Sequence, residues 1–450
     1  MNGKTILILA VSFSAIFIVF GKSFFSVSNK ATVDMVETLN EEKALGIAKS
    51  ATNIVVSYFW QKPDSVKLIG TTKTFFNQKD FEGGTVTTKL VRDSLHPDLY
   101  RIRTDAYYGR DENKKHKVVV VLYGPQDLTK MASYSESSGN IWWTGSDTVK
   151  GAIYCRSRIP VYNHPTFLSD VYSKSSGFRY YGGWRHRADN QPNVDPANLH
   201  FRTELKRPSA GKIMNDLKQK AKNGGWYLWG NNKGTNRYHG RRINWNSPSL
   251  DTLYIELKGQ NMDVKFSKND PPITYNIATK VPNKVIYANN YVVRLKGELD
   301  GQLLISCNGK RQKGKGKVLL DDDLVYKDDP RDGPSDDLLG IVAQNYVEIA
   351  DTPPNQSDIN IQAAIYVQSK GLTAENAKTK PDAGTINFYG SLIEGRRMEV
   401  GKFDPTTGQL WGYGRKYEYD ERLKTISPPS FPKLAGFNVL AWYEGDPPKY

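Results

Sequence analysis

The chain has 450 residues, which is enough for two or three domains at roughly 150 residues each. Hydrophobic residues make up 38% and charged residues 24%, a balance that excludes both a polytopic membrane protein and a disordered chain. Two cysteines cannot build a disulfide scaffold, and a net charge of +15 by itself specifies no partner. Aromatic residues make up 12%, and 38 Gly with 23 Pro favour strands and turns, so we expect a mainly β fold.

The first residues predict a membrane anchor. Residues 5–21 contain no charged side chain. At about 1.5 Å per residue they span roughly 25 Å, slightly less than the hydrocarbon core of a bilayer. Extending the segment to Val27 admits one charge, Lys22, whose side chain can reach the headgroups. We therefore expect an anchor over residues 1–27 that places the body outside the cytoplasm. Its apolar residues are Ile6, Leu7, Ile8, Leu9, Val11, Ile16, Phe17, Ile18, Val19 and Phe20.

An amphipathic helical pattern follows directly over residues 28–60. This stretch contains no proline and a single glycine, Gly46, and Pro63 comes shortly after it. Its apolar residues recur mostly at spacings of three and four, so we expect a helix that ends before Pro63. Small side chains at Ala44, Ala48 and Ala51 would permit close approach of a second helix.

A membrane helix that continues into an amphipathic helix and then a β-rich body is the plan of pilin-like proteins. The N-terminal segment resembles that of PilX-type minor pilins through Gly3-Lys4, the apolar run and the Ala48-x-x-Ala51-x-x-Ile54 stretch. The resemblance implies partners in the bilayer and in filament cores, namely lipid and other pilin-like helices.

Two cleavage sites compete with an uncleaved anchor. Signal peptidase requires small residues, which Ser26-Val27-Ser28 supplies. Prepilin peptidase cuts after a glycine, and Gly3 is available, but Ile8 stands where pilins usually carry glutamate. We therefore favour an uncleaved anchor, and ordinary pilin subunit packing is not implied.

Residues 61–283 predict a mixed β/α region. Residues 118–123, 141–145 and 152–154 form short apolar runs typical of strands. A helix is expected from Ser209, its N-cap, to Lys222, before Asn223-Gly224. Its apolar face would consist of Ile213, Met214, Leu217 and Ala221.

The stretch from Arg202 to Arg242 is the most basic in the chain, with 11 Lys or Arg against two acids. Basic groups interleaved with aromatic residues suit an anionic polymer such as single-stranded nucleic acid, although no nucleic-acid-binding motif is present. The alternative is a solvated helix face followed by a strand with buried Trp. The candidate anion-binding residues are Lys218, Lys220, Lys222, Trp226, Trp229, Arg237, Arg241 and Arg242.

Residues 284–450 predict a parallel β-solenoid-like domain. Apolar segments of three to five residues recur between Asn, Gly and Asp turns, and no obvious helix separates them. One element, Ala288-Asn289-Asn290-Tyr291-Val292, recurs 55 residues later as Ala343-Gln344-Asn345-Tyr346-Val347. Asparagine tolerates a left-handed corner between strands. The alternative, an antiparallel sandwich, would need longer strands with clear hairpin turns.

A second resemblance covers most of residues 140–445. Four segments in order are similar to a bacterial exported family of unknown function that is associated with pilus assembly. In the first segment, Gly151-Ala152-Ile153-Tyr154 replaces the family's Gly-Pro-Val-His, so any role of that His is absent. The family implies no activity. The four segments are residues 141–167, 285–306, 322–343 and 390–432.

Residues 321–337 contain eight aspartates, and clustered carboxylates on a loop can supply the six to eight oxygens that Ca²⁺ takes. The spacing is not that of an EF-hand, and a solvated loop is the alternative. Beside Arg331 the same carboxylates could serve a polysaccharide-active enzyme. The candidate metal ligands are Asp321, Asp322, Asp323, Asp328 and Asp329.

Other chemistry has little support in the sequence. Residues 309–316 end in Gly-Lys but lack the spacing of a phosphate-binding loop, so we expect no nucleotide cofactor. Cys155 and Cys307 could pair after export, although their separation in sequence does not show whether they meet.

These patterns favour a structural protein of the bacterial cell envelope without enzymatic activity. It would be a pilin-like or pilus-assembly component, held in the inner membrane or incorporated in an extracellular filament. One alternative is an anchored adhesin that binds an anionic glycan or nucleic acid. A second alternative is a β-helix enzyme that acts on polysaccharides.

Overall fold

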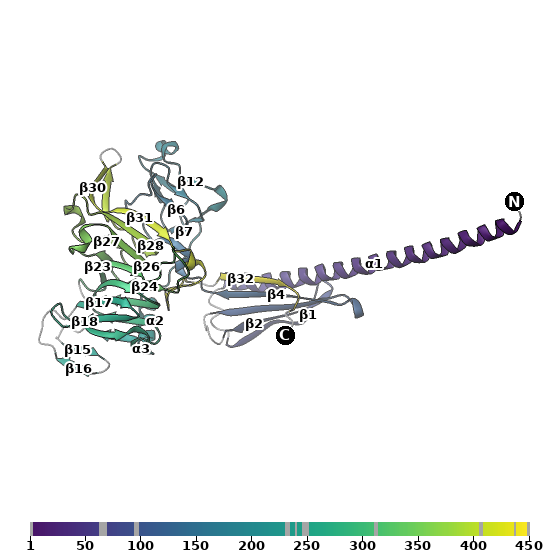
Figure 1. Ribbon diagram of the computed structural model, residues 1–450, viewed down its shortest axis with the longest axis horizontal. Coiled ribbons are helices and arrows are strands. Elements are labelled where there is room, and N and C mark those ends of the chain that lie inside the picture. The colour runs from purple at the N-terminus through teal and green to yellow at the C-terminus, as the bar shows by residue number, and fades with distance from the viewer. Residues whose placement is uncertain are drawn as a thin grey trace. The chain divides into compact units, whose positions relative to one another are not determined.

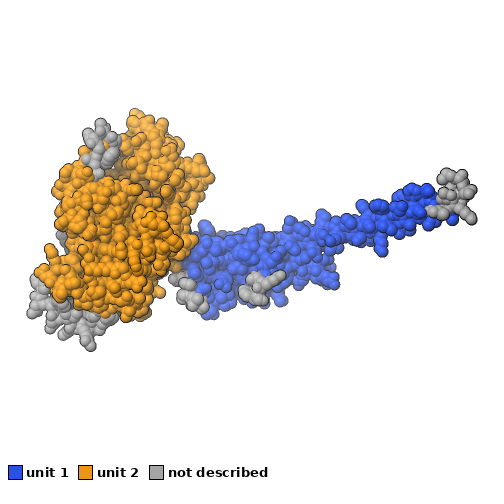
Figure 2. Space-filling view, in the orientation of Figure 1, with its two compact units in different colours: residues 1–126, 436–450 blue, residues 127–435 orange. Residues whose placement is uncertain are grey.

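The computed structural model describes residues 3–62, 70–93, 99–229, 235–238, 241–244, 252–309, 314–404, 408–435 and 438–447. Within them the chain is mainly β, with a long N-terminal helix and both parallel and antiparallel sheets (Figure 1). It divides into unit 1, residues 1–126 and 436–450, and unit 2, residues 127–435 (Figure 2). These bounds differ from those expected at residues 61 and 284, because the last strand pairs in unit 1 and early strands of unit 2 pair with later ones.

The described part of unit 1 contains the α-helix α1, a short 3-10 turn at Asp111–Asn113 and one antiparallel sheet. Helix α1 runs without interruption from Gly3 to Gln61, so the two helical segments expected from the sequence are a single helix. The strands follow the order β1-β2-β3-β4-β32 across the sheet. Their bounds are β1 Thr72–Phe81, β2 Gly84–Arg92, β3 Tyr100–Tyr108, β4 Lys115–Gly124 and β32 Asn438–Gly445.

The sheet of unit 1 is set by a tight turn and by alternation along its strands. Glu82 and Gly83 join β1 to β2 with φ of 49° and 82°, both left-handed, as a two-residue hairpin of the I′ type requires. Along β2, Val86, Thr88 and Leu90 are fully buried, and their neighbours in the strand are more exposed. One face of the sheet is therefore apolar and must be covered.

Unit 2 contains most of the strands. Its longer elements are α2 Ala210–Lys222, β17 Thr252–Gly259, β18 Asn261–Lys265, β20 Val285–Asn289, β21 Val292–Leu299, β22 Gln302–Asn308, β23 Lys317–Tyr326, β24 Leu338–Ala343, β26 Ile359–Val367, β28 Thr385–Glu394 and β31 Gly414–Tyr419. Its shorter elements are β5 Met131–Ser135, β6 Thr148–Val149, β7 Ala152–Cys155, β8 Ile159–Val161, β9 Thr166–Phe167, β10 Val171–Ser173, β11 Phe178–Tyr180, β12 Asn193–Val194, β13 Leu199–Phe201, β14 Trp226–Trp229, β15 Thr235–Tyr238, β16 Arg241–Asn244, β19 Ile273–Asn276, α3 Ile277–Lys280, β25 Tyr346–Ile349, β27 Leu372–Ala374, β29 Gly401–Asp404 and β30 Gly408–Gly412.

Parallel pairing dominates unit 2. One row of parallel strands follows the order β14-β20-β22-β24-β26-β28, and a second row follows β17-β21-β23-β25-β27. The first row continues from β28 through β5, β7, β10 and β13, so strands of residues 131–201 extend a stack formed by later residues. Short antiparallel strands occur beside these rows, for example β18 against β17 and β30 against β29.

The register of the first row places like side chains above one another. Ile286, Ile305, Ile341, Ile365 and Leu392 occupy successive strands in one column, and each is at most 5% exposed. Each strand thus buries the same positions against the next, and the core runs along the stack. The stack is stabilised by repeated burial of branched aliphatic side chains.

The repeated asparagine corners differ from one another. Asn290, between β20 and β21, has a φ of 60°, as expected for a left-handed corner, whereas Asn345, between β24 and β25, does not adopt a positive φ. Asn345 instead donates its side-chain amide to the carbonyl oxygen of Lys315 at 2.6 Å. Similar sequence at the two corners therefore supports different local conformations.

The helix predicted over residues 210–222 is confirmed as α2. The hydroxyl of Ser209 accepts a hydrogen bond from the backbone N–H of Lys212, so Ser209 is the N-cap. The predicted apolar face is buried and packs against β20 and β22 of the first row. Its residues are Ile213, Met214, Leu217 and Ala221.

One carboxylate lies inside the core of unit 2 and makes its stability depend on pH. Glu394, at the end of β28, is 3% exposed, and burial raises its pKa from 4.5 to about 7, although Arg397 and Arg415 oppose the shift. The pKa of Glu394 is higher in the folded chain than in the unfolded chain. Its favourable contribution to the free energy of unfolding is therefore complete below about pH 4.5 and is lost as the pH rises to about 7.

We expect Glu394→Gln to remove this loss, because glutamine keeps the oxygen that accepts the backbone N–H of Leu372. The free energy of unfolding of the variant should exceed that of the parent by about 3 kcal/mol at pH 8, with no excess at pH 4.5. Denaturant titrations of the full chain in detergent measure both values. Glu399→Gln, at a solvent-exposed ion pair, is the control, and equal pH profiles of all three proteins would contradict the raised pKa.

Candidate functional site

The first part of α1 exposes a continuous set of apolar side chains. Among the described residues, α1 is the helix long and apolar enough to cross a membrane, and the apolar window that qualifies it is not buried by the rest of the chain. Ile6 and Ile8 lie in α1, but their side chains lie outside the described part of the structure. The exposed fractions of the other expected anchor residues are Leu7 69%, Leu9 51%, Val11 63%, Ile16 49%, Phe17 73%, Ile18 70%, Val19 64% and Phe20 71%.

The second part of α1 packs against the sheet of unit 1 (Figure 1). Its buried residues recur at spacings of three and four, which places them on one face of the helix. They contact buried residues of β2, β3 and β4, including Leu90, Ile102 and Val121. The buried residues of α1 are Asn40, Ala44, Ile47, Ala48, Ala51, Thr52, Val55, Val56 and Phe59.

Small residues and hydroxyl groups allow the helix to lie close to the sheet. A Cβ at Gly84 would lie 2.5 Å from the backbone oxygen of Tyr107 and 2.7 Å from Ile47 Cδ1, so this position under the helix requires glycine. The hydroxyl of Thr52 lies 2.7 Å from that of Thr104, which in turn lies 3.0 Å from that of Thr88. These three buried hydroxyls satisfy one another within an otherwise apolar interface.

Ion pairs border the interface between α1 and the sheet. Glu37 pairs with Lys115 at 3.0 Å and Glu41 with Lys117 at 3.0 Å, both across to β4. The hydrogen bond from Lys117 to Asp446 raises the pKa of that lysine. The glutamates of both pairs remain exposed, so the pairs contribute little stability.

The three alanines expected to contact another helix are instead buried within the chain itself, and Ala48 and Ala51 pack against its sheet. Ala44, Ala48 and Ala51 are fully buried within unit 1, so they are not available to a partner subunit. Their spacing indicated close packing correctly but not the element that fills it. The large apolar residues of α1 beyond residue 27 that remain exposed are Val33, Met35, Val36, Leu39, Ile54, Tyr58 and Trp60.

The aspartates of residues 321–337 are divided between a strand and a loop. Asp321, in β23, pairs with Arg294 at 2.7 Å, and Asp323 accepts the backbone N–H of Asn360 at 2.7 Å. Asp322 accepts the backbone N–H of Asp323 at 2.9 Å. Each of these carboxylates therefore has a partner within the protein.

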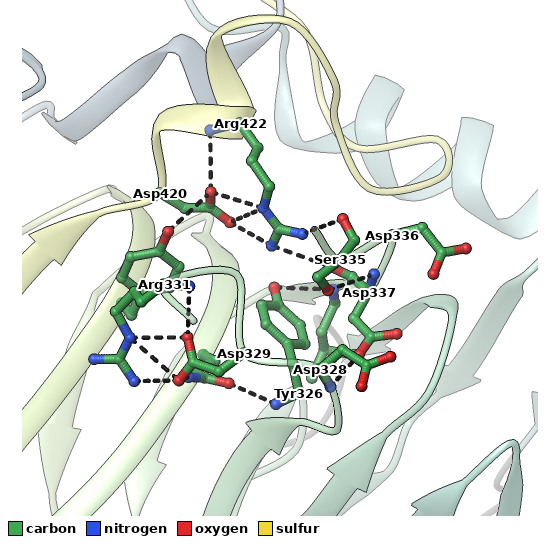
Figure 3. Close-up of polar contacts among 12 residues, drawn as sticks. Tyr326, Asp328, Asp329, Arg331, Ser335, Asp336, Asp337, Asp420 and Arg422 are labelled. Atoms are coloured by element: carbon green, nitrogen blue, oxygen red, sulfur yellow. Dashed lines mark hydrogen bonds and ion pairs between the residues drawn. The ribbon is translucent and has the colours of Figure 1, made fainter. Parts of the chain in front are cut away.

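The loop aspartates hold the turn after β23 (Figure 3). Arg331 donates to Asp329 at 2.9 Å, and this hydrogen bond lowers the pKa of that carboxyl to about 2. Asp337 accepts the backbone N–H of Asp328 at 3.0 Å. Within the described residues, no three His, Cys, Asp or Glu side chains gather as metal ligands would. The aspartates thus form turns and ion pairs, and the structure does not assemble them around a cation.

Asp420 and Arg422 anchor the same loop from the end of β31. Asp420 is 1% exposed, and Arg422 donates to it at 2.7 and 3.0 Å. The other donors of Arg422 reach the carbonyl oxygens of Ser335 and Asp337 at 2.9 and 3.1 Å (Figure 3). The loop is thereby fixed by a partly buried guanidinium that forms hydrogen bonds through all three of its nitrogens.

The basic stretch does not form an open stacking surface where it is described. Trp226 is fully buried in the core, and Trp229 is half-buried at the end of β14. Lys218 and Lys222 lie over the ring of Tyr227, at 5.8 and 5.4 Å from its centre. Lys220 is exposed on α2. Arg237 belongs to β15, and Arg241 and Arg242 belong to β16, but their side chains lie outside the described part of the structure.

The two cysteines are buried free thiols in different clusters of unit 2. Cys155 packs with Phe167 and Val171, whereas Cys307 packs with Ala288 and Ala343. Burial raises the pKa of the Cys307 thiol to about 12, so this group stays protonated and behaves as a core residue.

The chain matches no protein-family model and no curated protein. Among solved structures it is similar to the competence-associated pilin ComZ from Thermus thermophilus, with 11% identity and a TM-score of 0.39. The alignment covers 90% of this chain and 97% of ComZ. A likeness at this level carries no argument about the role of this chain, which has to rest on its own geometry.

Proposed function

We propose that this chain is a pilin-like structural protein of the bacterial cell envelope, anchored and assembled through α1. The observation that carries the proposal is the division of one uninterrupted helix into two parts. The first part has no charged side chain over residues 5–21 and exposes many large apolar ones, and the second part is covered by an antiparallel sheet of the same chain.

Insertion into a bilayer would explain why the first part of α1 exposes its apolar side chains. Side chains such as Phe17, Ile18 and Phe20 are at least 70% exposed, and each would gain about 1.5–3 kcal/mol by leaving water. All backbone groups within the helix are satisfied internally, as a membrane requires. Lys4 precedes the apolar run and favours an N-terminus on the cytoplasmic side, which sends the β units outward.

Helices of other subunits account for the exposed apolar residues that follow residue 27. Val33, Val36 and Leu39 lie between the anchor and the part of α1 that the sheet covers. They recur at a spacing of three, so they share one face. In a filament of a type IV pilus, of which this chain would be a minor subunit, this face would contact neighbouring helices as the anchor residues leave the bilayer.

Unit 2 would form the exterior part of the assembly. We interpret its two rows of parallel strands as successive coils of a β-solenoid, which supports the expected architecture. Such a stack presents long outer faces for contact and needs no turnover chemistry. The proposed mechanism is therefore anchoring and contact.

Protease treatment of spheroplasts tests the proposal. Protease added from outside should digest both units and leave only a fragment that contains the anchor, and alkaline carbonate should not release the chain from membranes. A protein in sheared filaments that still begins at Met1 or Lys4 would support incorporation with the helix intact. Complete protection of both units in spheroplasts, with digestion after lysis, would overturn the proposal.

A further inference from the structure

A pocket of about 310 Å³ lies in unit 2 and is separate from α1 and from the aspartate loop. Residues 146–150 form one side of it, and β28, Arg397 and β31 form the other. Lys150 and Lys416 line the pocket and are exposed, so it reaches solvent. Pockets of about this volume bury most of the surface of a small ligand, so this one suits a compound with a single small ring.

Two arginines give the pocket its charge. Arg397 is 6% exposed, and its guanidinium carbon lies 4.1 Å from the ring centre of Trp143. Nη1 of Arg397 is buried and has no hydrogen-bond partner among the described residues. Arg415 donates to the carbonyl oxygen of Trp142 at 3.4 Å, and its charge acts with burial to lower the pKa of Arg397. A buried donor beside a second cation is a place where an anion is favoured.

Each carboxylate near the two arginines makes a contact of its own. Glu394 accepts the backbone N–H of Leu372 at 2.8 Å. Asp147 accepts from the backbone N–H and the hydroxyl of Thr144 at 2.6 and 3.1 Å. Glu418 lies 3.9 Å from Lys150. None of these contacts involves Nη1 of Arg397, so this buried donor is available to an acceptor oxygen of a ligand.

The rest of the pocket lining combines aromatic rings with carboxylates, which limits the chemical class of the ligand. Trp143, Phe388 and Tyr417 supply aromatic surface, and Asp147 and Glu418 supply acceptors. A phosphodiester group has no hydroxyl donors for those acceptors, whereas a sugar ring has several hydroxyls and an apolar face. A guanidinium binds a carboxylate in a matching planar geometry.

We propose that this pocket binds one acidic sugar residue of the uronic-acid type. Its carboxylate lies between Arg397 and Arg415, its ring lies against the aromatic lining, and its hydroxyls donate to Asp147 and Glu418. The site is distinct from the basic stretch at residues 202–242, and it would give an anchored envelope protein a means of recognising acidic polysaccharide.

Isothermal titration of the full chain in detergent tests the site with two matched pairs of sugars. D-Glucuronate is compared with D-glucose, and D-galacturonate with D-galactose, which differ only in the carboxylate. At least one acid should bind ten times or more tightly than its neutral partner. Arg415→Gln and Arg397→Gln should each weaken that binding tenfold or more. Lys402→Gln, an exposed lysine outside the pocket lining, should leave it unchanged.

The variants differ in their risk to folding, which keeps the test decisive. Arg397 is in the core, so binding by the Arg397→Gln variant is interpreted only if its thermal unfolding matches that of the parent. If it does not, the variant at the half-buried Arg415 decides the test. Absence of binding by both acids overturns the site. Tighter binding of thymidine monophosphate than of either acid overturns the assignment to acidic sugars and favours a nucleic-acid partner. Equal weakening by Lys402→Gln would show a non-specific charge effect and also overturns the proposal.

Discussion

Ala51→Trp is expected to unfold unit 1 and leave the parallel stack of unit 2 intact. Ala51 is fully buried between α1 and the sheet, where a tryptophan side chain has no space. Overpacking by a single methylene already costs about 1–3 kcal/mol, so an indole should cost more than about 4 kcal/mol. Hydrogen exchange of the full chain in detergent, resolved by peptide, should show lost protection in β2, β3 and β4 and retained protection in β22 and β24.

Ile54→Trp is the matched control for this substitution. Ile54 is 49% exposed and lies three residues along the same helix, so its replacement should change protection in the sheet by less than about 0.5 kcal/mol. If Ile54 contacts another subunit, this variant should lower filament incorporation while unit 1 stays folded. An Ala51→Trp protein with normal exchange in β2–β4 would show that the helix does not pack on the sheet as described.

Introducing Ile16→Arg and Val19→Arg together should release the protein from membranes. Each arginine near the centre of a spanning helix costs about 2.5–3.5 kcal/mol, so the pair should cost roughly 5–7 kcal/mol. Both residues are exposed in α1, and neither belongs to the buried cluster between α1 and the sheet. The folding of unit 1 should therefore be unaffected. Fractionation of cells should move most of the protein from the membrane pellet to the soluble fraction.

The same pair of charges placed at Met35 and Thr38 provides the control. These residues are exposed on α1 beyond the expected anchor, and arginine there should leave membrane attachment unchanged. Quantitative recovery of the Ile16→Arg, Val19→Arg protein in carbonate-washed membranes would contradict the anchor. Release of both double variants would show that charge anywhere on α1 is sufficient, which the anchor proposal does not allow.

Local patterns predicted the helices well because their causes are local. The uncharged run of residues 5–21, the spacing of three and four after it, and Ser209 before an apolar face all act within a few turns of helix. Pairing between strands depends on residues far apart, and most strands of unit 2 are too short to identify their partners. The joining of β28 to β5, for example, brings together Ile393 and Tyr134, with no signal in either segment.

The sites show the same division between local and distant causes. The alanines of α1 signalled close packing, but their spacing does not distinguish a partner helix from the chain's own sheet. Clustered aspartates suggested a cation, yet the partners of Asp321 and Asp323, which are Arg294 and Asn360, come from other strands. Arg397 and Trp143 are far apart in sequence and meet only through the stack, so the pocket they line was not predictable from either motif.

The late position of β32 sets an order of events during biosynthesis. Strand β4 is complete at Gly124, but the strand that pairs with its free edge begins only at Asn438, after the whole of unit 2. At about 5–20 residues per second, the ribosome needs roughly 15–60 s to make the intervening chain. During that interval β4 presents unpaired N–H and C=O groups to other nascent chains. The sheet of unit 1, whose first four strands are made early, is thus completed last. Truncation anywhere before residue 438 leaves the edge of β4 unpaired and able to pair with other chains.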